Sequence, residues 1–171
     1  MLITNLSGAR AAGALLAVSA IALPAVATAA TATSSLGVNA TVTANCTVST
    51  SALAFGNVNT LSGSNVDGTG GISVTCTNGT GWSASAGLGG GAGATFASRK
   101  MVSGSNLLDY SLYTDSGRTS VWGDGTGSTA LLSGTGSGSA QAVTVYGRVP
   151  SGQISAPAGS YADTVSVTVT Y

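Results

Sequence analysis

Two segments in which apolar and polar residues alternate constrain this chain more than any other feature. In residues 161–171 the apolar positions are Val165, Val167 and Val169, and Tyr171 closes the segment. In residues 36–44 they are Leu36, Val38, Ala40, Val42 and Ala44. A two-residue period predicts half-buried strands. An exposed strand edge recruits another chain, so strands at both extremities favour an assembling protein over an enzyme.

Residues 1–30 have the order of a secretory signal peptide. Arg10 lies in a short polar leader, Ala11–Ala22 is an apolar run, and small residues follow Pro24. The apolar run is short for a spanning helix, although an N-terminal membrane anchor is the alternative. Cleavage near residue 30 would leave about 140 residues, enough for one domain with a substantial core.

The charged residues argue against catalysis and nucleic-acid binding. Beyond Arg10 the cations are Arg99, Lys100, Arg118 and Arg148, against five Asp, and the chain has no His and no Glu. Nucleic-acid binding needs a basic stripe, which is missing. Acid–base catalysis usually recruits His, Glu or clustered Asp, and Ser or Thr needs a base for activation. We therefore predict no enzymatic activity, catalytic residue, cofactor, metal or small-molecule substrate. Disorder is the other option for so few charges, but the apolar alternation argues against it.

The two cysteines, Cys46 and Cys76, both lie in the exported part. In an oxidising compartment an isolated pair is most simply a disulfide. Two free thiols are an alternative, and a metal site would need more ligands than a chain without His offers. We expect the disulfide.

Short strand-like segments with turn signals between them fill the rest of the chain, and no window has helical periodicity. Asn78-Gly79 predicts a tight hairpin between strands at 72–76 and 82–86. Residues 56–71 and 123–138 are expected to be glycine-rich connections. Further strands are expected at 46–48, 53–55, 94–102, 107–113, 118–122, 142–149 and 161–171. Such spacing predicts an all-β sandwich.

Three separated motifs carry a resemblance to a known family. They are Leu108–Gly125, which reads LDYSLYTDSGRTSVWGDG, the ending Pro157–Tyr171, and the start Asn45–Val48 with a partner at Val74–Cys76. Together they resemble the spore coat protein U domain family, the subunits of archaic chaperone–usher fimbriae. The likeness extends from about Leu36 to Tyr171.

The resemblance implies an incomplete immunoglobulin-like β-sandwich that lacks its last strand and is completed by a donor strand. It divides the chain into a signal peptide (1–30), an N-terminal extension with the donor strand (31–45) and a pilin domain (46–171). The donor residues would be Leu36, Val38, Ala40, Val42 and Ala44, and the strand facing the acceptor groove or chaperone would carry Val165, Val167, Val169 and Tyr171.

The implied function is that of a structural subunit of a secreted fimbria that supports surface attachment and biofilm formation. Its partners would be identical or related subunits, a periplasmic chaperone and an outer-membrane usher. The chaperone is expected to hold the carboxylate of Tyr171. Two alternatives stay open: residues 36–44 could be the first strand of their own sandwich, and the protein could be a self-contained coat or matrix protein that does not polymerise.

Two smaller motifs have a binding interpretation and a simpler one. Asp115 with Arg118 could form a binding pair, and Trp122–Thr126 could form a metal loop. We interpret both as turns, because an exposed ion pair has little energetic value and a calcium loop needs several spaced oxygen ligands.

Overall fold

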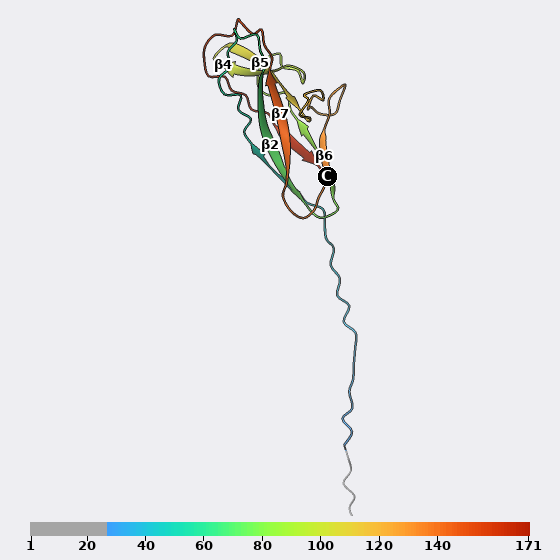
Figure 1. The fold of residues 1–171 in the computed structure, drawn as a ribbon. Coiled ribbons are helices and arrows are strands. Elements are labelled where there is room, and N and C mark those ends of the chain that lie inside the picture. The colour runs from blue at the N-terminus through green and yellow to red at the C-terminus, as the bar shows by residue number, and fades with distance from the viewer. Residues whose placement is uncertain (1–26) are drawn as a thin grey trace, which may run out of the picture. The chain divides into compact units, whose positions relative to one another are not determined.

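The computed structural model describes residues 27–171, and all regular structure within that range is β-strand (Figure 1). The signal-peptide prediction falls mostly on residues 1–26, outside the described residues. Within the described range there is no helix with the length and apolarity needed to cross a membrane. The eight strands are β1 (Cys46–Ser51), β2 (Val66–Cys76), β3 (Gly81–Ala86), β4 (Arg99–Ser103), β5 (Asn106–Tyr113), β6 (Leu132–Thr135), β7 (Gln141–Val149) and β8 (Val167–Thr170).

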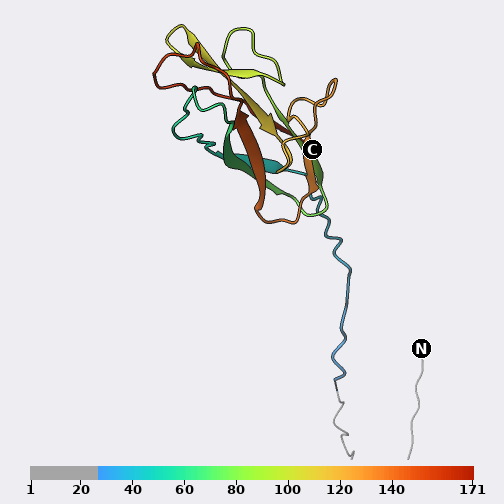
Figure 2. The same cartoon turned by 45° about the horizontal axis from the view of Figure 1, so that its top comes forward.

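The strands form two sheets, as the sequence predicts for a sandwich. One has five strands in the order β1-β2-β7-β5-β4, and the other has three in the order β6-β3-β8. All pairs between these strands are antiparallel. Figure 2 shows the strands of both sheets from a second direction. The edge strands are therefore β1 and β4 in the first sheet and β6 and β8 in the second.

The core is made by side chains that point inward at every second position of the strands. Its thirteen buried apolar residues are Ile72, Val74, Cys76, Trp82, Ala84, Ala86, Leu108, Tyr110, Leu112, Trp122, Leu132, Val145 and Val149. The period of two explains this arrangement, since successive side chains of a strand point to opposite faces. Both Trp residues are buried and donate their indole N–H, Trp122 to the Ala84 carbonyl at 2.9 Å and Trp82 to Gln141 Oε1 at 3.4 Å.

The predicted hairpin between 72–76 and 82–86 is wrong. Residues Gly81–Ala86 do form a strand, but it pairs with β6 and β8, whereas β2 pairs with β1 and β7. The Asn78-Gly79 turn exists, with Gly79 at a φ of 80°. This turn connects β2 in one sheet to β3 in the other. It is held next to β6, because the Gly79 amide donates a hydrogen bond to the carbonyl of Gly136, the residue that follows β6.

Several strand boundaries also differ from the prediction: β6 lies inside the expected connection 123–138, β4 begins only at Arg99, and residues 53–55 form no strand. Residues 66–71, expected to be part of a glycine-rich connection, are the first half of β2 and pair with β7 from Val66↔Val149 onward. The terminal strand is shorter than residues 161–171, since β8 covers only Val167–Thr170. The segment before it is held by an isolated bridge between Ala162 and Val102. The predicted pairing of 118–122 with 107–113 is present as a bridge between Tyr113 and Val121.

The predicted disulfide is confirmed. Cys46 of β1 and Cys76 of β2 are directly opposite each other in the antiparallel register and are covalently joined. The bond ties the root of the N-terminal extension to the core, because Cys76 is fully buried.

We expect Cys46→Ala with Cys76→Ala to lower the free energy of unfolding by about 3.5 kcal/mol, the chain-entropy value for a loop of this length. The sequence separation is 30 residues. Urea unfolding of the oxidised protein and of the double variant measures the difference. Equal midpoints for the two proteins would contradict a stabilising role.

Candidate functional site

An apolar pocket of about 1020 Å³ opens between two segments that flank the edge strands β1 and β8. One wall is the segment 52–61, which follows β1, and the other is the segment 156–167, which leads into β8. Strands β1, β2, β4, β5 and β7, together with Trp122, supply the rest of the lining. The large apolar side chains in the lining are Leu53, Phe55, Val58, Leu61, Ile72, Met101, Leu108, Tyr110, Leu112, Trp122, Val145, Tyr161, Val165 and Val167.

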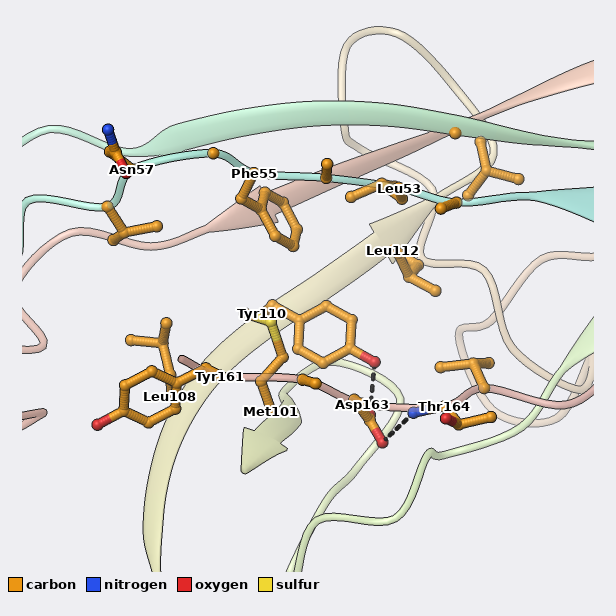
Figure 3. Close-up of a pocket in the computed structure, with 18 of the residues that line it drawn as sticks. Leu53, Phe55, Asn57, Met101, Leu108, Tyr110, Leu112, Tyr161, Asp163 and Thr164 are labelled. Atoms are coloured by element: carbon orange, nitrogen blue, oxygen red, sulfur yellow. Dashed lines mark hydrogen bonds between the residues drawn. The ribbon is translucent and has the colours of Figure 1, made fainter. Parts of the chain in front are cut away.

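The close-up in Figure 3 shows how the walls face each other. Leu53 and Phe55 approach from one side, and Tyr161 and Asp163 lie on the other. Tyr110 of β5 lies between them, with its ring edge-on to Phe55 at a centroid distance of 6.0 Å. The pocket is thus an opening in the core of the sandwich.

Both walls present backbone groups that lack partners. Among the hydrogen bonds of the described residues, none involves the backbone N–H or C=O of residues 52–58. On the opposite wall β8 is the last strand of its sheet, so one of its edges is open. Open edges on both sides of an apolar pocket have the geometry that accepts an added strand.

Three glycines let the first wall pack directly on the sheet. A Cβ added at Gly70 would lie 2.8 Å from the Cβ of Leu53 and 3.0 Å from its backbone N and Cα. At Gly147 it would lie 2.8 Å from both Leu53 methyl carbons and 2.9 Å from Phe55 Cζ. Gly68 is equally close to the carbonyl oxygen of Ala54, at 2.8 Å. The glycines of β2 and β7 therefore set the position of the wall.

We expect Gly70→Val to displace residues 52–55 and narrow the pocket, because the clash is with backbone that cannot rotate away. Overpacking of this kind costs about 1–3 kcal/mol of stability. The matched control is Gly81→Val, since a Cβ at Gly81 meets nothing within 4 Å. In thermal unfolding, the melting temperature should fall for Gly70→Val and stay unchanged for Gly81→Val. Equal melting temperatures for the two variants would mean that Gly70 does not set the position of residues 52–55.

A single carboxylate lies in the pocket lining, and it is fully engaged. Asp163 Oδ2 accepts a 2.6 Å hydrogen bond from the Tyr110 hydroxyl. Its Oδ1 accepts 2.7 Å bonds from the amides of Gly90 and Thr164. Burial raises the pKa of Tyr110 well above its ordinary value, and the hydrogen bond to Asp163 raises the pKa further. Tyr110 is thus held as a neutral donor that ties the second wall to β5.

Beside this pair, a fully buried arginine links three loops. Arg99 has 0% exposure, and its guanidinium donates to the carbonyls of Gly87, Phe96 and Trp122 at 2.9, 3.1 and 2.7 Å. Burial lowers the pKa of Arg99, while Tyr110 and Asp163 oppose that change. The arginine is structural, because its donors are directed at backbone carbonyls and not into the pocket.

The residues predicted for the last strand are placed unequally. Val165 and Val167 line the pocket, and Val169 packs partly buried against the core. Tyr171 is more than half exposed. The sequence missed Leu53, Phe55, Tyr110 and Asp163 as pocket residues. The sequence did point to two of these residues indirectly, because Tyr110 and Asp163 lie in the motifs Leu108–Gly125 and Pro157–Tyr171 that carry the family resemblance.

The predicted donor segment contains no strand. Residues 27–45 have no regular structure, and Leu36, Val38 and Val42 are 88, 84 and 84% exposed. The alternative raised by the sequence, that this segment is the first strand of its own sandwich, stays open. Its role as a donor stays a prediction.

The two smaller motifs are turns. The Asp115 carboxylate accepts hydrogen bonds from the amides of Thr119 and Ser120, and the Asp124 carboxylate accepts from the amide and hydroxyl of Thr126. These hydrogen bonds lower the pKa of both carboxyls. Arg118 contacts Asp67 instead of Asp115, at 3.3 Å.

A two-layer β-sandwich whose core opens between unpaired backbone segments is an incomplete immunoglobulin-like domain. Comparison with known families gives the same result, because residues 32–168 match the Spore Coat Protein U domain. The chain belongs to this family, as the three motifs indicated. No curated protein matches the chain.

One solved structure with a similar fold is the CsuC–CsuE chaperone–tip adhesion subunit pre-assembly complex from the archaic chaperone–usher Csu pili of Acinetobacter baumannii. The TM-score is 0.54 and the sequence identity 24%. The match covers 77% of this chain and 40% of that chain, so the likeness concerns well under half of the other protein. It confirms the fold expected from the sequence.

Proposed function

We propose that this protein is a structural subunit of a bacterial fimbria, in which residues 36–44 of one subunit fill the apolar pocket of the next. The observation that carries the proposal is the pocket between residues 52–61 and 156–167, apolar inside and bordered by open backbone edges. A strand inserted there would satisfy backbone groups on both sides and cover the core.

The donor segment has the properties that the pocket requires. Leu36, Val38 and Val42 are exposed in their own chain and lie on one face with Ala40 and Ala44. Burying these five side chains would contribute on the order of 5–8 kcal/mol, with the alanines adding least. Main-chain hydrogen bonds would add a modest amount each.

Before assembly the same pocket needs a temporary occupant. A periplasmic chaperone would supply a strand beside Val165, Val167, Val169 and Tyr171, and an outer-membrane usher would exchange it for the donor. The family and the chaperone-bound state of the similar Csu subunit support these partners. The proposal includes removal of residues 1–30 on export, an extension at 31–45 and the pilin domain at 46–171. It also places the fibre on the cell surface, where it would support attachment and biofilm formation, and assigns it no enzymatic role.

Deleting Leu36–Ala44 tests the proposal. The variant should still be exported and bind its chaperone but should form no heat-resistant ladder of subunits. Adding a synthetic peptide of residues 36–44 should then release the chaperone and raise the melting temperature. If the unmodified protein purified as a stable monomer that the deletion destabilised, a self-contained coat protein would be the better description.

A further inference from the structure

One polar side chain lies on the core-facing side of the last segment of the chain. The apolar residues of 161–169 that pack against the core are Tyr161, Val165, Val167 and Val169. They alternate with exposed residues, and the remaining position of the same alternation is Asp163. Its side chain lines the pocket together with those of Val165 and Val167. A carboxylate among apolar neighbours is rare unless it is paired or fully hydrogen-bonded, so Asp163 needs an explanation that a valine would not.

The surroundings of this carboxylate are built to receive it. Its Oδ2 accepts a hydrogen bond from the hydroxyl of the buried Tyr110 at 2.6 Å, and its Oδ1 accepts from the amides of Gly90 and Thr164 at 2.7 Å each. Figure 3 shows the bonds from Tyr110 and Thr164. The glycine-rich loop is fitted around the carboxylate, because a Cβ added at Gly89 would collide with it. Only an acceptor at this position satisfies all three donors.

The alternation of the segment does not by itself fix its alignment with β3. The two strands pair through the four residues of β8. A shift of two residues would place Val165, Val167, Val169 and Tyr171 where Asp163, Val165, Val167 and Val169 now lie. Apolar side chains would still face the core, because a shift of two keeps every side chain on its own face of the strand. The preceding loop 150–160 contains no strand, and a loop of this length absorbs two more residues at small entropic cost.

Asp163 distinguishes the two alignments. The bridge between Ala162 and Val102 uses backbone groups alone, so any residue with a backbone N–H can make it. The hydrogen bonds of Asp163 depend on its side chain, and after the shift a valine would face the Tyr110 hydroxyl and the Gly90 amide. We infer that Asp163 is a positioning residue that fixes the register of β8, the strand at the open edge of the pocket. Buried polar groups fix register in this way where apolar positions repeat, at some expense of stability.

The register of β8 decides how much edge the pocket presents to an added strand, and this consequence rests on the proposed function. In the shifted register Tyr171 would occupy the place of Val169, so the open edge would end two residues earlier. The terminal carboxylate would move by the same two residues, about 7 Å along the strand. The opposite wall, residues 52–58, would not move, because Gly70 and Gly147 let it pack directly on the sheet. A shifted subunit would therefore present less edge to the chaperone strand and to the donor.

Disulfide trapping in the exported subunit measures the register directly. Ser85 lies opposite Thr168, at a separation that a disulfide can bridge. Ser85 and Thr170 become opposite only after the shift, and in the observed register they are diagonal neighbours, about 7–8 Å apart and too distant for a disulfide. Ser85→Cys with Thr168→Cys therefore reports the observed register, and Ser85→Cys with Thr170→Cys reports the shifted one. In the otherwise unmodified chain, peptide mapping should find the first disulfide at least tenfold more abundant than the second.

Replacing the carboxylate should reduce this preference. Asp163→Val leaves the Tyr110 hydroxyl without its acceptor in either register, so the ratio of the two disulfides should fall at least tenfold. Asp163→Asn should keep the ratio, because its amide can accept from the two backbone amides and donate to the Tyr110 oxygen. Tyr110→Phe removes one donor and should lower the ratio by a smaller factor. Tyr161→Phe is the matched control, since it loses a 2.9 Å bond to the Pro157 carbonyl within the same wall and should not change the ratio.

An unchanged ratio in both Asp163→Val and Tyr110→Phe would overturn the inference and leave the proposed function intact. An equal fall of the ratio in Asp163→Asn would overturn it as well, because that variant keeps the hydrogen bonds. If Asp163→Val did not fold, the ratio in Tyr110→Phe would decide. Where Asp163→Val folds, its yield of heat-resistant ladders should fall by the shifted fraction. Absence of ladders from the unmodified chain would contradict the proposed function but not the register, which is read from disulfides within one subunit.

Discussion

Replacing Val38 and Val42 together by aspartate should abolish fibre growth. Each valine buried in the pocket contributes about 1.5–3 kcal/mol, which the substitution removes. Each carboxylate would also have to leave water, at an effective cost of several kcal/mol when it has no partner. The sum exceeds the 5–8 kcal/mol that apolar burial of the whole donor provides. Heat-resistant ladders of subunits should therefore disappear, while the exported subunit remains bound to its chaperone.

The opposite face of the same segment supplies the control. Asn39 and Thr41 alternate with the valines, so they should face outward when the valines face the pocket. Asn39→Asp with Thr41→Asp adds the same two charges and should leave the ladders intact. Loss of assembly in both double variants would show that charge alone blocks export or usher binding. Normal ladders from the variant with both valines replaced would mean that residues 36–44 are not the donor strand.

The β architecture could be predicted because its signals are local. The alternation at Ile72, Val74 and Cys76 indicated a strand with one buried face, and all three side chains are in the core. The disulfide followed from the export context, which leaves an isolated cysteine pair few other states. The family motifs carried the prediction of an incomplete sandwich further than periodicity could.

The wrong predictions of strand boundaries and of the hairpin come from sequence patterns that two different structures can produce. The glycine content of residues 56–71 predicts a connection, but Gly68, Gly70 and Gly71 lie inside β2, and a side chain at Gly68 or Gly70 would collide with residues 53–55. Asn78-Gly79 fixes a turn but not the sheet that the next strand joins. That choice depends on the long-range pairing of β3 with β6 and β8, which no local pattern encodes.

The pocket itself could not be derived from periodicity. Its walls, 52–61 and 156–167, are about a hundred residues apart in sequence and meet only because β1 and β8 end up at open edges. Residues 53–55 gave a short strand signal, yet they form no strand in the structure. The reason is that the sandwich contains no strand that pairs with them. An inserted donor strand would supply that partner.

Arg99→Met should be the most destabilising single substitution in the domain. An arginine is almost never fully buried unless its charge and donors are satisfied. Here three backbone carbonyls, those of Gly87, Phe96 and Trp122, depend on one guanidinium. Each buried carbonyl left without a donor costs about 1–3 kcal/mol. Relief of the buried charge offsets part of this loss, which leaves a net decrease on the order of 4–5 kcal/mol.

The same substitution should act on the pocket, because Trp122 is in its lining and the Gly87 carbonyl lies next to the loop that holds Asp163. We expect a urea midpoint lower by roughly 2 M, given slopes of about 1–3 kcal/mol/M for domains of this size. Lys100→Met is the matched control, since Lys100 lies one residue further along β4 and makes a partly exposed ion pair with Asp109 at 2.6 Å. An exposed pair contributes about 0–1 kcal/mol, so the control should change the midpoint little. Equal shifts for the two variants would mean that the three carbonyls find other donors, and that Arg99 does not hold the loops behind the pocket.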